Sequence, residues 1–329
     1  SSKNDFIPTY QSTNSTFETS SYVSDDFYGL LDDGEGIWTA DAVDIGVGRI
    51  PVKSKEEAQI AVAKIINYAT NNFSGTSSFG NWRNVVCFIA DDGDINTHIS
   101  QANQQATMID TTYKNYNIDK IYLDAYEQTT VPGGNRYPSV NDAIDKRVEQ
   151  GALIINYTGH GSETNLAHEA ILTSSTIPDL ANPSKLFLFI TASCQVSKYD
   201  NPDRNSAGEF ALLQANGGAI ALLSTVRAVF ASPNFELNKN FYKSVFEPIN
   251  GRMPRLGDLY QYVKTQAGGN SVNSRSFALL GDPALTLAYP KHEVITDSIN
   301  HIAVTTPLTD TLKALTLVTI SGHIQDSTG

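Results

Sequence analysis

Two short apolar segments, ALIINYTGHG (residues 152–161) and LFLFITASC (residues 186–194), indicate both the fold and the place of the chemistry. Continuous runs of aliphatic, aromatic and β-branched residues of this length are typical of strands buried in a parallel sheet. The first run leads to His160 and the second ends at Cys194. Because reacting groups gather at the carboxyl ends of the strands in an open parallel sheet, we expect the imidazole and the thiol at one edge of the sheet.

A thiol beside an imidazole is typical of the active site of a cysteine peptidase or acyltransferase. The thiolate is the nucleophile, and the imidazole can take its proton and return a proton to the leaving group. The tetrahedral intermediate also needs hydrogen-bond donors, and we expect the backbone N–H groups of Gly161 and Cys194 to supply them. The small residues around His160 and Cys194, TGHG and TASC, let the chain approach a substrate closely.

A zinc site is the competing use of Cys and His residues. His160 and His168 are eight residues apart and Cys194 is a lone thiol, so the spacing matches no standard zinc motif and we expect no metal. The other cysteine, Cys87, lies in the apolar run VVCFI and is expected to be a small buried hydrophobe. The other histidines are expected at the surface or in loops: His98, His168, His292, His301 and His323.

The bulk composition describes a globular chain without a nucleic-acid partner. The 329 residues are 40% hydrophobic and carry a net charge of −12, whereas phosphate binding needs clustered Lys and Arg. No apolar run is long enough to span a membrane, and the chain starts without an initiator Met, so we expect a piece of a longer protein. The acidic stretch DDFYGLLDDGE (residues 25–35) could hold a structural calcium ion, but its spacing is not that of an EF-hand, and a solvated loop is the simpler interpretation.

Strands alternate with helices along most of the chain, which predicts an α/β fold with helices on both faces of a parallel sheet. The breaker-rich segment VPGGNRYP (residues 131–138) separates two β/α sets. Beyond residue 290 the run LTLVTI (residues 315–320) is β-rich and has no helix before it. We therefore expect four parts: an N-terminal lead-in at 1–36, a subdomain A at 37–135, a catalytic subdomain B at 136–290, and the truncated start of an all-β, Ig-like module at 291–329.

Two capping boxes mark helix starts. Ser54 and Glu57 begin one helix, and Ser206 and Glu209 begin another. In the first helix the apolar residues recur with helical spacing and are expected to face the core: Ala58, Ala61, Val62, Ile65, Ile66 and Ala69.

Longer motifs carry a resemblance to a known family. NYTGHGSET (residues 156–164), ASC (192–194), ASP (231–233) and GDPA (281–284) resemble the motifs of the gingipain family of cysteine peptidases, which has a caspase-like fold. The resemblance runs from about residue 22 to residue 289. Within the family the chain looks closest to the PorU-type sortases of the bacterial type IX secretion system, because of SDDFYGLLDD (residues 24–33) and of ADDGD followed by His98.

The resemblance implies that His160 and Cys194 are a catalytic dyad. It also implies a third member after the Cys87 strand, which by position is Asp92, with Asp91 as the alternative. Such a carboxylate would orient His160, although a loop carboxylate or helix cap is an equally good interpretation.

The pocket is expected to differ from that of the gingipains that cleave after Arg or Lys. Those enzymes carry an acidic residue shortly after the third catalytic position, where this chain has NTHI (residues 96–99). His98 and Phe230 are the expected pocket residues, and Gln195 replaces the usual residue after the nucleophile. We therefore expect a small or uncharged substrate residue.

The resemblance further implies a sortase. Cys194 would cleave the C-terminal signal domain of a secreted cargo protein and transfer the cargo to an amine of a surface lipopolysaccharide, without a cofactor. Other outer-membrane components of type IX secretion would be partners at the bacterial cell surface. Two alternatives stay open: an endopeptidase that only hydrolyses, and a non-catalytic caspase-like scaffold of a secretion complex.

Overall fold

The computed structural model describes residues 7–13, 17–36, 38–70, 80–266, 271–304 and 311–326. It divides into two compact units, Ser1–Ala288 and Tyr289–Gly329. Among the described residues, no helix combines the length and the apolar character needed to cross a membrane.

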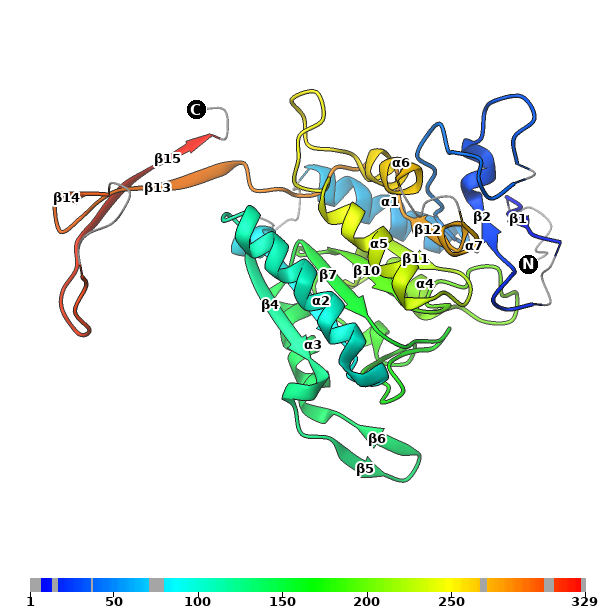
Figure 1. Ribbon diagram of the computed structural model, residues 1–329, viewed down its shortest axis with the longest axis horizontal. Coiled ribbons are helices and arrows are strands. Elements are labelled where there is room, and N and C mark those ends of the chain that lie inside the picture. Colours follow the sequence, from blue (N-terminus) through cyan, green and yellow to red (C-terminus); the bar gives the residue numbers. More distant parts are fainter. Residues whose placement is uncertain are drawn as a thin grey trace. The chain divides into compact units, whose positions relative to one another are not determined.

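A six-stranded sheet forms the centre of the first unit (Figure 1). Five strands are parallel and the edge strand β12 is antiparallel, which confirms the predicted α/β fold. The sheet is continuous across the expected boundary between the two subdomains, because strands from both sides of residue 135 pair with each other. In spatial order the strands are β12 (Phe277–Leu280), β11 (Ala219–Thr225), β10 (Phe187–Ala192), β7 (Ile154–Thr158), β3 (Val85–Ala90) and β4 (Asn117–Tyr122).

Helices cover both faces of this sheet. Side chains alternate between the faces of a strand: Phe88 packs against Tyr242 of α5, whereas the neighbouring Cys87 belongs to a core cluster with Ala61 of α1 and Ile144 of α3. Helix α5 also contacts α2 and α6, and α1 contacts α4. The helices are α1 (Lys55–Thr70), α2 (Gly93–Thr112), α3 (Pro138–Gln150), α4 (Ala207–Leu213), α5 (Ala231–Tyr242), α6 (Leu256–Thr265) and α7 (Val272–Arg275).

Short elements complete the first unit. Four of them are single 3₁₀ turns, η2 (Asp25–Gly29), η3 (Asn81–Asn84), η4 (Leu123–Ala125) and η5 (Ile177–Asp179). The others form three two-stranded antiparallel pairs: β1 (Tyr10–Gln11) with β2 (Val23–Ser24), β5 (Thr129–Val131) with β6 (Gly134–Arg136), and β8 (Asn165–Leu166) with β9 (Leu172–Thr173).

The buried face of α1 is rotated about the helix axis from the face that the sequence predicted. Val62 and Ile66 are 51% and 54% exposed, whereas Ala61, Lys64 and Tyr68 are buried. The spacing of apolar residues had placed these two exposed side chains on the predicted core face. The helix instead turns a lysine and a tyrosine inward, because both have polar partners inside.

Lys64 closes the end of α4. Its Nζ donates hydrogen bonds to the carbonyl oxygens of Leu212 (2.7 Å) and Gly217 (2.8 Å). Burial lowers the pKa of Lys64 to about 7. At its other end α4 begins with the predicted capping box, in which Ser206 and Glu209 bond each other's backbone N–H groups.

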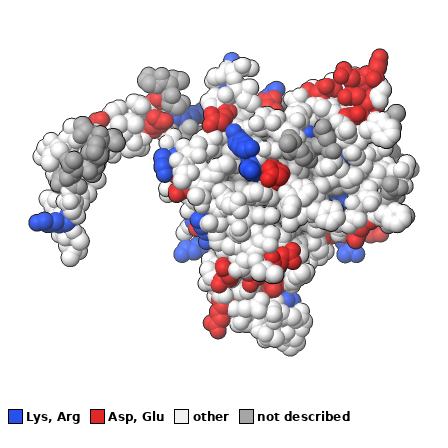
Figure 2. All heavy atoms as spheres, viewed as in Figure 1, with Lys and Arg blue, Asp and Glu red and all other residues white. Residues whose placement is uncertain are grey.

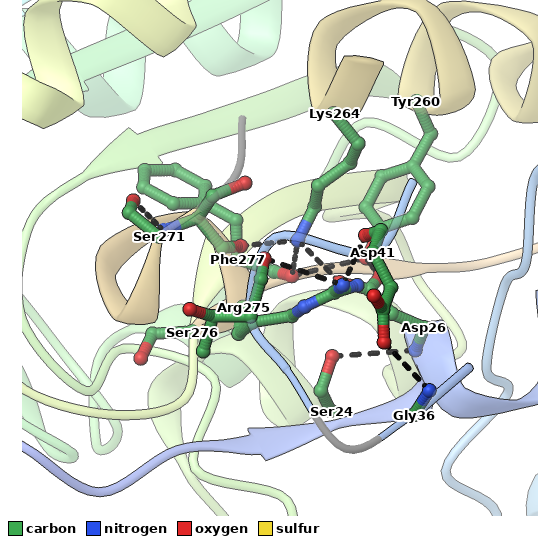
Figure 3. Close-up of polar contacts among 12 residues, drawn as sticks. Ser24, Asp26, Gly36, Asp41, Tyr260, Lys264, Ser271, Arg275, Ser276 and Phe277 are labelled. Carbon is green, nitrogen blue, oxygen red and sulfur yellow. Dashed lines mark hydrogen bonds and ion pairs between the residues drawn. The ribbon is translucent and has the colours of Figure 1, made fainter. Parts of the chain in front are cut away.

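The N-terminal segment is anchored by a buried ion cluster (Figure 3). Asp26 is 1% exposed, lies 3.0 Å from both Lys264 and Arg275, and accepts a hydrogen bond of 2.5 Å from Tyr260. These cations hold the pKa of Asp26 below its usual value, although burial opposes them. Asp25 forms an ion pair with Arg49. The interpretation of residues 25–35 as a solvated acidic loop is therefore wrong at its first two residues, because both carboxylates have internal cationic partners.

The second unit contains a three-stranded antiparallel sheet. Its central strand β13 (His292–Ile299) pairs with β14 (Ile302–Ala303) and with β15 (Ile320–Asp326). The β-rich run at residues 315–320 only reaches the start of β15.

Charges of both signs are mixed over the face drawn in Figure 2. Asp and Glu side chains gather in groups, and Lys and Arg lie singly or in small sets between them. This distribution agrees with the net charge of −12.

Candidate active site

Three neighbouring strands end at the same level of the sheet. Ala90, the last residue of β3, is in register with Thr158, the last residue of β7, and Thr158 is in register with Ala192, the last residue of β10. His160 and Cys194 each follow two residues beyond their strand. Parallel pairing therefore delivers both side chains to one edge, as the sequence predicted.

The chain segments carrying His160 and Cys194 touch at Gly159 and Gly161. The Gly159 N–H donates to the Ala192 carbonyl over 3.4 Å. A Cβ on Gly161 would lie only 2.3 Å from the Ser193 Oγ, far inside ordinary contact distance. The backbone after His160 thus packs directly against the residue before Cys194, and a larger residue at position 161 would displace the Ser193 side chain or the loop that carries it.

Cys194 lies in a turn held by the next strand. Its Sγ is 3.5 Å from both the backbone nitrogen and the carbonyl oxygen of Val229, and the residue is partly exposed. Gln195 has a φ of 57°, in the left-handed region that non-glycine residues rarely adopt. Hydrogen bonds from Gln195 N–H to Arg227 and from the Thr225 hydroxyl to Ser193 stabilise the turn. Hydrogen bonds thus join the turn that carries the thiol to the end of β11 and the residues after it.

His160 is fixed through its backbone, and its ring is 35% exposed. Its N–H donates to the Asp91 carboxylate (3.0 Å), and its carbonyl accepts from the Tyr157 hydroxyl (2.5 Å). Burial raises the pKa of Tyr157 well above 10, which keeps this phenol a donor. The ring stacks on that of His168 with centroids 4.7 Å apart. His168 is exposed, as predicted, yet it belongs to the site.

Three carboxylates near His160 have different partners. Asp91 bonds the backbone N–H groups of His160 and Gly93. Asp92, the first choice for a third catalytic residue, accepts a hydrogen bond of 2.6 Å from Tyr137. The carboxylate that faces the imidazole is Asp94, with its Oδ2 3.4 Å from the His160 Nε2. Sequence reasoning missed Asp94, although it ends the quoted run ADDGD.

The two expected pocket residues lie near His160 and Cys194. His98 is only 6% exposed, so its expected place at the surface is wrong, and its ring meets that of His160 edge to face at 5.2 Å. Burial and the neighbouring His160 lower the pKa of His98, while Asp91 and Asp94 raise it, and the net shift is downward. Phe230 is 58% exposed and follows Val229, whose backbone contacts the thiol.

The family model Peptidase family C25 matches residues 1–288. This chain belongs to peptidase family C25. Lys-gingipain of Porphyromonas gingivalis is 31% identical over 130 residues, which is 40% of this chain and 7% of the relative. The crystal structure of the Arg-specific cysteine proteinase gingipain R superposes with a TM-score of 0.63 at 19% identity, over 84% of this chain and 62% of that chain. Latent PorU of Porphyromonas gingivalis matches 99% of this chain and 25% of that chain, at 20% identity and a TM-score of 0.39.

Family C25 is a family of gingipain-like cysteine peptidases, and its model includes the N-terminal segment anchored by Asp26. Residues 1–36 are thus within the family match, together with the sheet. The chain covers less than two thirds of the length of the gingipain R chain and of Lys-gingipain.

In this C25 chain the backbone amides of Gly161 and Cys194 have no hydrogen-bond acceptor within the described ranges. Both lie where the two loops meet, and unpaired donors there could bind an oxyanion. The site thus brings together a partly exposed thiol, an imidazole and two N–H donors.

Proposed function

We propose that this chain is a cysteine peptidase of the sortase type, with Cys194 as nucleophile and His160 as its proton-transfer partner. The observation that carries the proposal is the contact between the two loops, in which Gly161 packs on Ser193 at the shared carboxyl edge of β7 and β10. Membership of peptidase family C25 supports the proposed peptidase chemistry.

The first half-reaction forms an acyl-enzyme. His160 takes the proton of the Cys194 thiol, the sulfur attacks the carbonyl carbon of the scissile peptide, and the amides of Gly161 and Cys194 stabilise the oxyanion. The C–N bond then breaks as the departing amine receives the proton from His160. The His160 Nε2 faces Asp94, so Nδ1 is the nitrogen left to exchange protons with the thiol. Asp94 acts as a positioning residue, and Asp92 and Asp91 support the site through Tyr137 and the His160 backbone.

The second half-reaction decides between peptidase and sortase. Water attack on the thioester gives hydrolysis, and attack by an amine transfers the acyl group to that amine, with the thiolate leaving in both cases. We propose transfer of cargo, freed of its C-terminal signal domain, to a lipopolysaccharide amine at the cell surface, with other type IX secretion components as outer-membrane partners. The proposal of transfer to lipopolysaccharide is supported by the sequence motifs that resemble those of PorU-type sortases.

The pocket is proposed to accept an uncharged side chain. The buried His98 and the exposed Phe230 flank the dyad, and burial keeps His98 predominantly neutral at pH 7. The gingipains that cleave after Arg or Lys carry an acidic residue where this chain has the imidazole of His98. We therefore propose a preference for a small or uncharged substrate residue over Arg or Lys.

Mass spectrometry of a cargo C-terminal signal peptide, incubated with the protein and excess glycine, tests the proposal. We expect a cleaved product that carries glycine at its new C-terminus. Cys194→Ala should give no product, whereas the matched variant Cys87→Ala should retain activity, because Cys87 is buried in the β3 core.

The other outcomes identify the alternatives. A cleaved product without glycine would support an endopeptidase that only hydrolyses. The absence of any Cys194-dependent product, together with failure of iodoacetamide to modify Cys194, would support the non-catalytic scaffold.

A further inference from the structure

Three ligand atoms converge on the outer side of His160. The Oδ2 of Asp94 lies 3.4 Å from the Nε2 of His160 and 3.4 Å from the Nε2 of His98. One ligand atom from each of the three side chains lies within 4.8 Å of the others. Two imidazoles thus face one carboxylate oxygen.

These spacings fit a metal ion better than hydrogen bonds. Good N–H···O hydrogen bonds are about 2.7–3.2 Å long, so 3.4 Å is long for both. In a tetrahedral zinc site with ligand bonds of about 2.0–2.1 Å, neighbouring ligand atoms are about 3.3 Å apart. Both distances to Asp94 match that edge length.

His98 provides a second, independent indication of a ligand. Its side chain is 7% exposed, and within the described residues neither ring nitrogen has a hydrogen-bond partner. The 3.4 Å contact of its Nε2 with Asp94 is too long for a good hydrogen bond. A buried imidazole without a good hydrogen bond is costly, because most buried polar atoms in proteins are satisfied. The Nε2 of this ring lies 3.4 Å from the Asp94 Oδ2, the same oxygen that is 3.4 Å from the His160 Nε2.

We propose that Asp94, His98 and His160 form a site for a divalent metal ion of the zinc class, and that the bound ion inhibits the enzyme. Two imidazoles and one carboxylate with an open fourth position are ligands that suit Zn²⁺. The inhibitory part rests on the proposed function. A metal on Nε2 fixes the proton of His160 on Nδ1, so the ring has no lone pair left to accept the proton of Cys194.

The spacing of residues in the sequence does not predict this site, because its ligands follow two different strands. Asp94 and His98 follow β3, and His160 follows β7. Residues 94–96 all have positive φ, between 52° and 58°. This left-handed turn is the local geometry from which the Asp94 side chain reaches both rings.

Isothermal titration of Zn²⁺ into the Cys194→Ala protein tests binding without the thiol. We expect one tight site, weakened at least tenfold by His98→Gln and by Asp94→Asn. Asp94 is 57% exposed, so its substitution keeps the fold even where loss of the buried His98 does not. The matched control His323→Gln removes another imidazole that faces a carboxylate, Asp297, in the second unit, and should leave the tight site unchanged.

Absence of a tight site, or a site unaffected by both Asp94→Asn and His98→Gln, would overturn the proposal. Inhibition is tested separately on the wild-type protein, where micromolar Zn²⁺ should block peptide cleavage and a chelator should restore it. Tight binding by a protein without peptidase activity would refute the proposed function and leave the metal site standing. Cleavage that is insensitive to Zn²⁺ at saturation would refute the inhibitory role.

Discussion

The contact between Gly161 and Ser193 predicts a large effect from one methyl group. In Gly161→Ala the new Cβ would lie 2.3 Å from the Ser193 Oγ, whereas ordinary contacts begin near 3.4 Å. Either the Ser193 hydroxyl must turn away within its buried site or the two loops must separate by about 1 Å. A misplacement of this size can lower an enzymatic rate about 100-fold. The backbone N–H of residue 161 is retained, so the loss reports geometry and not a missing donor.

The size of the expected loss is about 2.7 kcal/mol of transition-state stabilisation. The assay is kcat/KM for cleavage of a signal peptide, with thermal unfolding measured in parallel to show that the variant is folded. Overpacking of this kind costs about 1–3 kcal/mol of stability, which a unit of this size should survive.

Ser193→Ala supplies the matched control. The Ser193 Oγ is buried and has no hydrogen-bond partner among the described residues, so its removal alone should change activity less than threefold. Because the next atoms near the new Cβ are 3.3 Å and 3.4 Å away, the double variant should recover most of the lost activity. Near-wild-type activity of Gly161→Ala, or no recovery in the double variant, would refute the reasoning.

Two further predictions concern stability and are checked by urea unfolding. Asp26→Asn leaves Lys264 and Arg275 buried without their counter-charge and should lower the free energy of unfolding by about 3–5 kcal/mol. The control variant Glu236→Gln removes an exposed partner of Lys239 and should lower it by less than about 0.5 kcal/mol. Because the pKa of Asp26 is lowered in the folded state, its contribution is complete above its unfolded value of 3.8 and is lost as the pH falls further. A difference between Asp26→Asn and wild type that grows as the pH is lowered below 3.8 would contradict this. Lys64→Met leaves carbonyl groups at the end of α4 without a donor and should cost about 1–3 kcal/mol; an unchanged unfolding midpoint would show that these bonds contribute nothing.

Local signals were sufficient for the elements that carry the dyad. Apolar runs predicted β7 and β10. The small residues after them were expected to let the chain approach a substrate, and the structure shows Gly161 packed on Ser193. The capping box at Ser206 was also correct, because its hydrogen bonds involve residues only three apart. Each of these features depends on neighbours in the sequence.

Predictions failed where a distant partner decided the outcome. Val62 and Ile66 fit the predicted apolar face of α1 but are exposed. The helix buries Lys64 instead, because its ammonium group donates a hydrogen bond to the Leu212 carbonyl of α4. Asp26 looked like part of a solvated loop, and its partners Lys264 and Arg275 lie more than 200 residues away. No local pattern contains such partners.

The sequence by itself determined the α/β class, the strands that end at His160 and Cys194, and the motifs of the family. Only the tertiary structure decided which carboxylate faces the imidazole, because Asp91, Asp92 and Asp94 lie within four residues of one another and only Asp94 lies in the left-handed turn. It also decided that His98 and Asp94 meet His160. Strand order and register bring these groups together, and both depend on contacts across the whole sheet that no single stretch of sequence contains.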